Sequence, residues 1–416
     1  MNSIYKFGGS SLKNAANIKL VTKIISENKE DDMVIVFSAM GKVTNMLEEV
    51  VNSYFKKQKK VRNLLKKVRD FHVSLANQLF NKNDKVFDEI NNLIVEIEWV
   101  IDDAPTDNYS YYYDQIVAIG ELLSTKIMSA FLHKNDIINH WTDIRDIVRT
   151  DDSYRNAKIH WNDTMRFACK NLKSGIVVTQ GFIGSTSENN TTTLGREGSD
   201  FTAAILAYCL NAKKVIIWKD VPGLMNADPA IFDQTQLFTH ISYDEAIELA
   251  FFGAKVIHPK TIQPLKKKLI PLQIKSFYNS NEKGTIISKI SNQNIDVESY
   301  IVKENQILIS ISARDLTFIV ENHISQIFSI LSKNLIEVNL MQNSAVSFSV
   351  CVDNDKFKVP KTINELKSFF SVVYNDNLIL YTIKNYNKGS LEKLVNKNNI
   401  ILQQKSRTTV QLIAKV

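Results

Sequence analysis

Cysteine is scarce in this chain of 416 residues, which contains only Cys169, Cys209 and Cys351. An odd number of cysteines this far apart predicts neither a disulfide framework nor a cysteine-based metal cluster, so we expect all three to be small apolar packing residues. The sequence also lacks an uninterrupted run of about eighteen apolar residues and an N-terminal signal-peptide pattern. These absences favour a cytoplasmic protein without a membrane-spanning helix.

Acidic residues are fewer than basic ones, and the formal net charge is +7. The lysines are scattered among asparagine and isoleucine and form no aromatic-rich basic surface of the RRM type, so we expect no nucleic-acid partner. A positive field favours a small polyanionic substrate instead. The composition, with 44% hydrophobic and 23% charged residues, is that of a globular protein, and the length suggests two or three domains.

Short runs rich in valine, isoleucine and phenylalanine predict buried strands at residues 4–7, 33–37, 176–179 and 215–218. Each is followed by a glycine- or serine-containing turn and then by a segment with helical spacing. This alternation predicts an α/β domain with a mainly parallel sheet between helices, which binds its ligands at the carboxyl ends of the strands. A lysine-rich stretch with helical spacing predicts a helical lobe at about residues 55–100, with a solvated basic face.

A polar, turn-rich stretch at residues 279–300 predicts a boundary between a first domain, residues 1–285, and a C-terminal part, residues 300–416. The pattern then restarts as small α+β modules of β-α-β type. We expect strands at 307–311, 346–352, 378–382, near 400 and at 410–414, and a helix at 391–396. A further helix is expected to bury one face made of Ile324, Ile327, Phe328 and Leu331.

The sequence has neither a P-loop nor a G-x-G-x-x-G motif after a strand, so a phosphate site must be built differently. Residues 4–11 read I-Y-K-F-G-G-S-S. Lys6 lies on the first predicted strand, Gly8 and Gly9 let the backbone approach an anion, and Ser10 or Ser11 can cap a helix that begins at residue 12. Taken alone, this stretch fits a phosphate site and also fits a tight strand-to-helix turn.

Polar residues also precede the almost entirely apolar stretch 201–210, which predicts a buried helix. The preceding segment, T-T-T-L-G-R-E-G-S-D, places Arg196 beside a helix N-terminus, and arginine offers two parallel hydrogen bonds to a carboxylate. At the end of the fourth strand, W-K-D-V-P-G-L-M predicts the lining of a nucleotide pocket. In G-A-K-V-I-H-P, residues 253–259, Lys255 is expected to meet phosphates and His258 to be a structural turn residue.

Together and in this order, six motifs resemble the aspartokinases of the amino acid kinase family, over about residues 1–290. They are K-F-G-G-S-S, F-S-A-M-G-K-V-T-N, G-E-L-L-S, T-T-L-G-R-E-G-S-D-F-T-A, D-V-P-G and G-A-K-V-I-H-P. The C-terminal part resembles the tandem ACT regulatory modules of that family. With no second dinucleotide fingerprint in the sequence, the resemblance is to the monofunctional form.

This resemblance implies ATP-dependent phosphorylation of the β-carboxylate of L-aspartate to 4-phospho-L-aspartate. That reaction is the first step of lysine, threonine, methionine and diaminopimelate biosynthesis. The implied cofactors are ATP and Mg²⁺, with the metal brought by the nucleotide and no direct protein ligands. The implied assembly is a homodimer through the ACT-like region.

The resemblance also implies individual roles. Lys6 and Asp200 would be catalytic, with Asp200 orienting the lysine. Glu121 would pair with the α-amino group of the substrate, and Arg196 with its α-carboxylate. The aspartate-binding set is Ser38, Thr44, Glu121, Arg196 and Ser199, and the nucleotide- or phosphate-binding set is Lys6, Gly8, Gly9, Ser10, Lys219, Asp220, Met225, Lys255 and Val256.

The chain departs from the family pattern at several positions. Glu197 replaces a glycine, Ala230 replaces a basic residue that reaches the nucleotide, and Met225 replaces a tyrosine. In lysine-inhibited relatives two carboxylates meet the effector's amino groups, and here Asn339 and Ala345 stand at those positions. We therefore expect weak or absent inhibition by lysine.

Two alternatives remain. The chain could be another amino acid kinase, acting on glutamate, N-acetylglutamate, carbamate or UMP, although the ACT-like tail speaks against it. It could also be a catalytically silent relative that serves as a regulatory subunit. The retention of Lys6, Glu121, Arg196 and Asp200 speaks against that second reading, because a silent copy has no reason to keep charges converging on an empty cleft.

Overall fold

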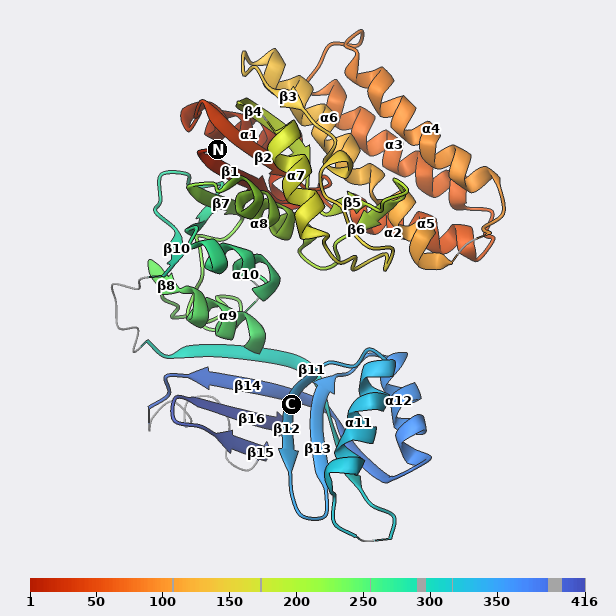
Figure 1. Cartoon of the computed structure of the whole chain (residues 1–416), viewed down its shortest axis with the longest axis vertical. Coiled ribbons are helices and arrows are strands. Elements are labelled where there is room, and N and C mark those ends of the chain that lie inside the picture. The colour runs from red at the N-terminus through yellow and green to blue at the C-terminus, as the bar shows by residue number, and fades with distance from the viewer. Residues whose placement is uncertain are drawn as a thin grey trace. The chain divides into compact units, whose positions relative to one another are not determined.

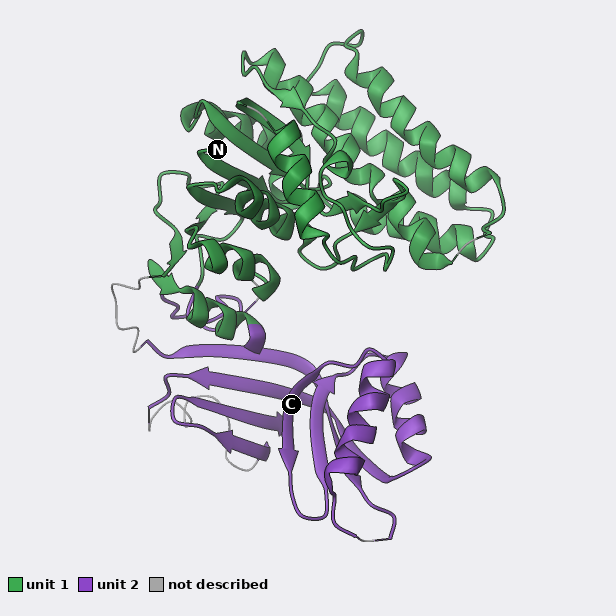
Figure 2. Ribbon diagram, viewed as in Figure 1, with its two compact units in different colours: residues 1–224, 237–250, 255–294 green, residues 225–236, 251–254, 295–416 purple. Residues whose placement is uncertain are grey.

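The computed structural model describes residues 1–106, 108–172, 174–254, 256–289, 297–315, 317–387 and 399–415. The chain divides into two compact units (Figure 2). The first contains residues 1–224, 237–250 and 255–294, and the second contains residues 225–236, 251–254 and 295–416. The two short segments of the second unit that precede residue 295 were not anticipated from the sequence.

An eight-stranded sheet with the order β3-β4-β2-β1-β7-β9-β10-β8 forms the centre of the first unit. All neighbouring strands are parallel except β9 and β10. The four strands predicted from the sequence are confirmed as the adjacent strands β4, β2, β1 and β7. The strands are β1 (Ser3–Phe7), β2 (Asp32–Phe37), β3 (His140–Trp141), β4 (Gly175–Gln180), β7 (Lys214–Lys219), β8 (His240–Ser242), β9 (Leu272–Ser276) and β10 (Thr285–Ser288), with a separate hairpin of β5 (Ile183–Ser185) and β6 (Thr191–Thr193).

The central strand β1 is held between β2 and β7 by its aromatic residues. Phe7 pairs in register with Phe37 on one side and with Trp218 on the other. The ring of Phe7 stacks on both, with centroid distances of 5.6 Å to Phe37 and 5.9 Å to Trp218. Burying three large rings in contact stabilises this part of the sheet by several kcal/mol, on the order of 2 kcal/mol for each side chain. The carboxyl ends of the three strands are therefore fixed side by side.

Two groups of helices pack on this sheet. Helix α8 contacts β1, β2 and β7 and also packs on α7 and α10, whereas α6 contacts β2, β3, β4 and α1 (Figure 1). The helices are α1 (Ala15–Glu27), α2 (Val43–Phe55), α3 (Val61–Asn77), α4 (Val86–Asp102), α5 (Tyr109–Val117), α6 (Ile119–Lys134), α7 (Trp161–Asn171), α8 (Gly198–Leu210), α9 (Tyr243–Phe252) and α10 (Pro259–Lys268), with short 3-10 helices at Gly9–Leu12 and Ile144–Asp146.

The first helix begins later than the sequence predicted. We expected Ser10 or Ser11 to cap a helix from residue 12, but these serines lie inside the 3-10 turn and α1 begins at Ala15. The N-cap is Asn14, whose side chain accepts a hydrogen bond of 2.8 Å from the backbone N–H of Asn17. The prediction was wrong because an asparagine three residues further on is an equally good cap.

Helices α2, α3, α4, α5 and α6 contact one another as a bundle (Figure 1). In α3, Leu65, Val68 and Leu75 are buried, whereas the lysines are exposed.

Residues 109–134, which include α5 and α6, are long and apolar enough to cross a membrane. However, 83% of their most apolar window is buried inside the unit, as in the core helix of a soluble protein.

Helix α3 also carries a histidine that is completely buried. The Nδ1–H of His72 donates to the carbonyl oxygen of Val68 at 2.7 Å, and its Nε2 has no partner among the described residues. Burial lowers the pKa of His72 to about 4, and the hydrogen bond to Val68 offsets this only in part. The unfolded chain therefore binds a proton at a pH where the folded chain does not, and folding stability falls as the pH falls from about 6.5 to about 4.

We expect His72→Leu to flatten this part of the stability profile, because leucine fills the site without a titrating group. Urea unfolding at about pH 4.5 and at about pH 7 measures the slope. His133→Gln, at an exposed histidine on α6, is the control. An equally steep acid decline in the His72→Leu variant would show that other groups cause it.

The second unit is built on a six-stranded antiparallel sheet with the order β12-β13-β11-β14-β16-β15. Two long strands of 14 residues each, β11 and β14, pair at its centre. The elements are β11 (Ser299–Ser312), α11 (Glu321–Lys333), β12 (Val338–Asn343), β13 (Phe348–Asp353), α12 (Lys358–Lys367), β14 (Ser371–Lys384), β15 (Ile400–Lys405) and β16 (Thr409–Lys415).

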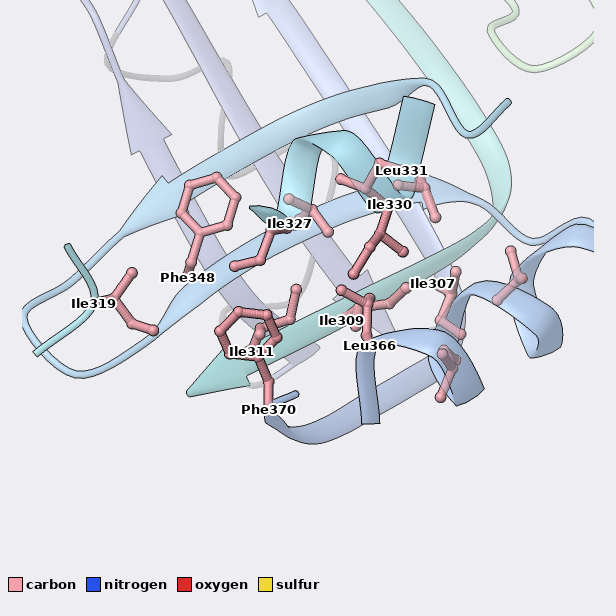
Figure 3. Packing of buried hydrophobic residues seen from close by; sticks show 14 of the residues in the cluster. Ile307, Ile309, Ile311, Ile319, Ile327, Ile330, Leu331, Phe348, Leu366 and Phe370 are labelled. Carbon is pink, nitrogen blue, oxygen red and sulfur yellow. The ribbon is translucent and has the colours of Figure 1, made fainter. Parts of the chain in front are cut away.

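The alternation of β11 divides the core of this unit. Ile307, Ile309 and Ile311 point toward α11 and α12 and pack with buried residues of both helices (Figure 3). Leu308, between them, belongs to a separate cluster with Leu340, Cys351, Leu378, Leu380 and Ile413. Since successive side chains of a strand face opposite sides, this pattern shows that both faces of the sheet bury apolar residues.

Several predictions for the second unit need correction. Strands β11 and β14 extend well beyond the predicted runs, because their polar residues pair with each other across the sheet. Phe328 is 37% exposed, although its ring contacts that of Phe348 in an edge-to-face arrangement, so the buried face of α11 is Ile327, Ile330 and Leu331. Cys169 in the first unit is exposed, unlike the other two cysteines. The helix predicted at 391–396 lies outside the described residues.

Candidate active site

Three charged side chains meet at the carboxyl ends of strands β1 and β7, next to the N-terminus of helix α8. The Nζ of Lys6 lies 2.6 Å from Oδ1 of Asp200, and the Nζ of Lys219 lies 3.0 Å from Oδ2 of the same carboxylate. Lys6 is near the end of β1, Lys219 is the last residue of β7, and Asp200 is in the first turn of α8. The parallel sheet and the helix packed on it therefore bring together residues that are about 200 positions apart in the sequence.

Electrostatics fixes the charge state of this cluster. Burial alone would raise the pKa of Asp200, but the two ammonium groups outweigh it and lower the pKa to about 2. Burial alone would lower the pKa of Lys219, but Asp200 and then Glu197 outweigh it and raise the pKa. Two cations thus share one carboxylate, which leaves one positive charge in excess. A site of this kind attracts an anion.

The turn after β1 is glycine-rich because it lies directly against the turn after β2. A Cβ on Gly9 would be 2.8 Å from the carbonyl oxygen of Ala39 and 2.9 Å from that of Gly41, which no real side chain tolerates. A Cβ on Gly8 would be 3.3 Å from the Nζ of Lys6. The two glycines therefore keep the backbone close and the space next to the ammonium group free.

A cleft of about 480 Å³ opens beside this cluster. Eight of the predicted site residues line it together, although they come from β1, the turn after β2, α2, α6, the segment before α8, α8 and β7. They are Lys6, Ser38, Thr44, Glu121, Arg196, Ser199, Asp200 and Lys219.

Glu121 is buried at the wall of the cleft, and only one of its two carboxylate oxygens has a hydrogen-bond partner among the described residues. Its Oε1 accepts a hydrogen bond of 3.2 Å from the backbone N–H of Ala39, and its Oε2 has no partner among the described residues. Burial raises the pKa of Glu121 to about 8, and the bond from Ala39 and the charge of Lys6 offset this only in part. A buried carboxyl group with a free oxygen calls for a cationic partner from a ligand.

The other predicted residues lie elsewhere. Gly8, Gly9 and Ser10 form the turn behind Lys6, and Asp220 is exposed at the end of β7. Val256 is half-buried ahead of α10. Met225 belongs to the second unit, and Lys255 lies outside the described residues. His258 caps α10 by accepting a hydrogen bond from the N–H of Lys260 at 3.1 Å, which confirms its structural role.

The residue that departs from the family pattern stands at the start of α8. Glu197 is the N-cap and has a left-handed backbone with φ of 52°. That conformation favours glycine, the residue it replaces. One of its carboxylate oxygens is buried without a hydrogen-bond partner among the described residues, and its charge acts on Lys219. The charge of Glu197 therefore offsets part of the positive excess that Lys6 and Lys219 leave beside Asp200.

Five further residues that line the cleft were missed. Asn45, Glu48, Tyr113, Arg155 and Phe182 are all part of its wall. Asn45 closes the motif F-S-A-M-G-K-V-T-N and could have been found from it. The other four lie outside the motifs, and only the packing of the fold brings them to the cleft.

Comparisons with known proteins agree with this geometry. The sequence model of the amino acid kinase family matches residues 1–276. Lysine-sensitive aspartokinase 3 of Escherichia coli (strain K12) is 28% identical over 391 residues, which cover 91% of this chain and 86% of that protein. Aspartokinase 1, chloroplastic, of Arabidopsis thaliana is 31% identical over 371 residues, covering 85% of this chain and 63% of that protein.

The structure is similar to that of E. coli aspartokinase III in complex with aspartate and ADP. The TM-score is 0.84 at 26% identity, over 100% of this chain and 96% of the other. The chain spans only 42% of a bifunctional relative, aspartokinase/homoserine dehydrogenase 2, chloroplastic, of Arabidopsis thaliana.

The match over residues 1–276 shows that the chain belongs to the amino acid kinase family, and the mainly parallel sheet with Lys6, Arg196 and Lys219 in one cleft agrees with this. Within that family, the relatives and the whole-chain structural neighbour described above are aspartokinases, and the resemblance predicted from the six motifs is confirmed.

Proposed function

We propose that the chain transfers the γ-phosphoryl group of ATP to the β-carboxylate of L-aspartate, giving 4-phospho-L-aspartate and ADP in amino acid biosynthesis. The observation that carries this proposal is the cluster of Lys6, Asp200 and Lys219 in one cleft with Glu121 and Arg196. A new bond joins a carboxylate oxygen to the γ-phosphorus, and the bond from that phosphorus to the β,γ-bridging oxygen breaks.

The cleft offers a complementary group for each charge of a bound aspartate. The free oxygen of Glu121 would accept the α-ammonium group, and the guanidinium of Arg196 would bind the α-carboxylate. Ser38, Thr44 and Ser199 supply hydroxyl groups along the same wall. The β-carboxylate would then lie toward Lys6, where the phosphoryl group arrives.

The chemistry needs charge compensation more than proton transfer. A β-carboxylate is already ionised at neutral pH, so the nucleophile needs no general base. Two anions must come together, and the excess positive charge of Lys6 and Lys219 lowers the cost of that approach. Asp200 would hold both ammonium groups in place from a carboxylate that stays ionised.

The proposed nucleotide site combines Lys6, Gly8, Gly9, Ser10, Lys219, Asp220 and Val256, which all belong to the first unit. Among the described residues, no group of three or more acidic, histidine or cysteine side chains could hold a metal ion. Asp200 is moreover already engaged by two lysines. A Mg²⁺ ion brought by the nucleotide would add to the charge compensation that Lys6 and Lys219 supply.

We further propose that residues 1–285 form the catalytic domain and residues 300–416 tandem ACT-like modules, through which the chain forms a homodimer in the cytoplasm. Exposed edges of antiparallel sheets pair readily, and β12 and β15 are the two edges of the sheet in the second unit.

We expect lysine to leave turnover unchanged. The amide of Asn339 is already engaged inside the second unit. Its Oδ1 accepts from Lys303 at 2.7 Å, and its Nδ2 donates to Gln306 at 2.8 Å and to Asp353 at 2.9 Å. An ammonium of the chain itself thus occupies the oxygen that a lysine effector would need. Turnover measured across a lysine titration checks this, and half-maximal inhibition by millimolar lysine would contradict it.

The test of the proposed function is ATP- and Mg²⁺-dependent formation of an acyl phosphate, trapped as the hydroxamate, with L-aspartate and with L-glutamate. We expect turnover with aspartate only. Turnover with glutamate instead would move the chain to another amino acid kinase activity. Stabilisation by aspartate and nucleotide without any turnover would identify a silent regulatory subunit.

A further inference from the structure

Arg155 lines the cleft although it belongs to none of the motifs. Hydrogen bonds to the buried carboxylate of Asp114 fix its backbone there, and we call this arrangement the Asp114 clamp. The N–H of Arg155 donates to both oxygens of Asp114, at 2.9 and 3.1 Å. The same buried carboxylate accepts from the N–H of Thr193 at 2.8 Å and from its hydroxyl at 2.7 Å. Arg155 itself has a left-handed backbone with φ of 59°. A conformation that costs about 1 kcal/mol is thus held by four hydrogen bonds to one side chain.

This clamp places Arg155 next to the segment that carries Arg196. A Cβ on Gly195 would be 3.1 Å from the carbonyl oxygen of Arg155 and 2.8 Å from Oδ1 of Asn156, so the two segments touch at a glycine. The Nζ of Lys260 bridges them, with 2.9 Å to Oδ1 of Asn156 and 3.0 Å to the carbonyl oxygen of Leu194. The structure therefore builds Arg155 and Arg196 into one wall.

Within the described part of the chain, no carboxylate lies within ion-pair distance of the guanidinium of Arg155 or Arg196, although the charge of Arg155 acts on the buried Asp114. The guanidinium of Arg155 lies over the ring of Tyr113 at 4.6 Å and over that of Tyr109 at 5.5 Å. Stacking on rings orients the planar group and leaves its N–H groups available. An anion bound in this cleft would be attracted by both cations.

We propose that Arg155 is a second substrate-binding arginine, which binds with Arg196 the carboxylate of the amino-acid substrate that is not phosphorylated. This inference rests on the proposed function and deepens it. The reacting carboxylate goes to Lys6, so the arginine pair is left for the other one. Two guanidinium groups on one carboxylate make the cleft selective for a dicarboxylic amino acid.

Two other partners for Arg155 are tested alongside. Glu48 lines the same cleft, and its charge acts on Tyr109 and Tyr113, over which the guanidinium lies. The γ-phosphate of the nucleotide is the second candidate, because it enters the same cleft. Each of the three partners predicts a different response to the same substitution.

The experiment compares the wild type with Arg155→Gln, Arg155→Lys and a control, Arg166→Gln, at an exposed arginine on α7. Substrates are L-aspartate and its α-amide, which keeps the β-carboxylate but lacks the α-carboxylate charge. Since Asp114 holds the backbone N–H, the substitutions leave the clamp in place. We expect Arg155→Gln to raise the KM for aspartate about 10- to 100-fold, with kcat and the KM for ATP nearly unchanged.

Arg155→Lys is expected to raise the KM for aspartate less than Arg155→Gln does. With the α-amide as substrate, Arg155→Gln is expected to have the same KM as the wild type. An equal loss with both substrates would reduce Arg155 to a structural role. A raised KM for ATP in Arg155→Gln would show that Arg155 binds the γ-phosphate. Unchanged kinetics in that variant would show that Arg155 pairs with Glu48 instead. Aspartate binding measured by calorimetry separates the two proposals, because weaker binding to Arg155→Gln would support this inference even without turnover. A wild type that does not bind aspartate would overturn both.

Discussion

Lys6→Ala is expected to lower kcat by about a hundred- to a thousandfold, the effect of removing one preorganised charge from a phosphoryl-transfer site. The Lys6 side chain is 9% exposed, so water has little access to the place where the two anions would meet. Folding should be preserved, because Asp200 keeps its ion pair with Lys219 at 3.0 Å. The KM for aspartate should change much less than kcat, since the proposed role of Lys6 is to act on the phosphoryl group in transfer.

The measurement is hydroxamate-trapped turnover at saturating aspartate and ATP, with thermal unfolding recorded for each variant. Lys19→Ala, at an exposed lysine on α1, is the matched control and should behave as the wild type. If Lys6→Ala kept more than about a tenth of wild-type kcat, the transferred phosphoryl group would lie elsewhere in the cleft.

Glu121→Gln is expected to weaken aspartate binding by about a hundredfold, because the ammonium group of the substrate would lose a buried carboxylate. The amide keeps the shape of the side chain and can still accept the hydrogen bond from Ala39. Loss of affinity without loss of folding would therefore report the charge alone.

The pH dependence of folding stability is a second test of Glu121. Burial raises the pKa of Glu121 to about 8, so the free protein holds its proton at pH 7, whereas an unfolded glutamate with a pKa near 4.5 does not. The folded state binds more protons between these two values, and folding stability falls as the pH rises from about 4.5 to about 8. Glu121→Gln should remove that decline and be the more stable protein at pH 8.

Aspartate binding should release this proton, since the ammonium group of the substrate favours the ionised carboxylate. Titration calorimetry at pH 7 in two buffers of different ionisation enthalpy counts the protons released. We expect close to one for the wild type and close to none for Glu121→Gln. Equal proton release by both proteins would place the ammonium group of the substrate on another residue.

The parts of the fold and site that could be predicted are those that local sequence determines. A continuous apolar run followed by glycine or serine marks a buried parallel strand, and all four strands predicted for the first domain are present. The motifs around Lys6, Glu121 and Asp200 could be read because each combines a charged residue with an apolar or glycine-rich setting. The structure brings these three together as neighbours in one cleft.

The rest depends on contacts between distant segments. The polar ends of β11 and β14 become strand only because they pair with each other, and neither segment shows this alone. Arg155 reaches the cleft through hydrogen bonds to Asp114, some 41 positions earlier. The start of α1 was missed for a different reason, since two neighbouring sites offered caps of equal quality.

Two early segments, residues 225–236 and 251–254, belong to the second unit although residues of the first unit precede and follow them, and this limits how the polypeptide can be divided. Residues 225–236, which carry Met225, fold as part of the second unit. The carbonyl oxygen of Asn226 accepts from the N–H of Tyr300 at 2.7 Å, and the ring of Phe232 packs on that of Tyr300 at 5.4 Å. A fragment that ends near residue 290 would contain residues 225–236 but lack Tyr300, with which they form these contacts. Recombination or truncation at the predicted boundary would thus yield two damaged halves, and a transplantable C-terminal module must bring residues 225–236 with it.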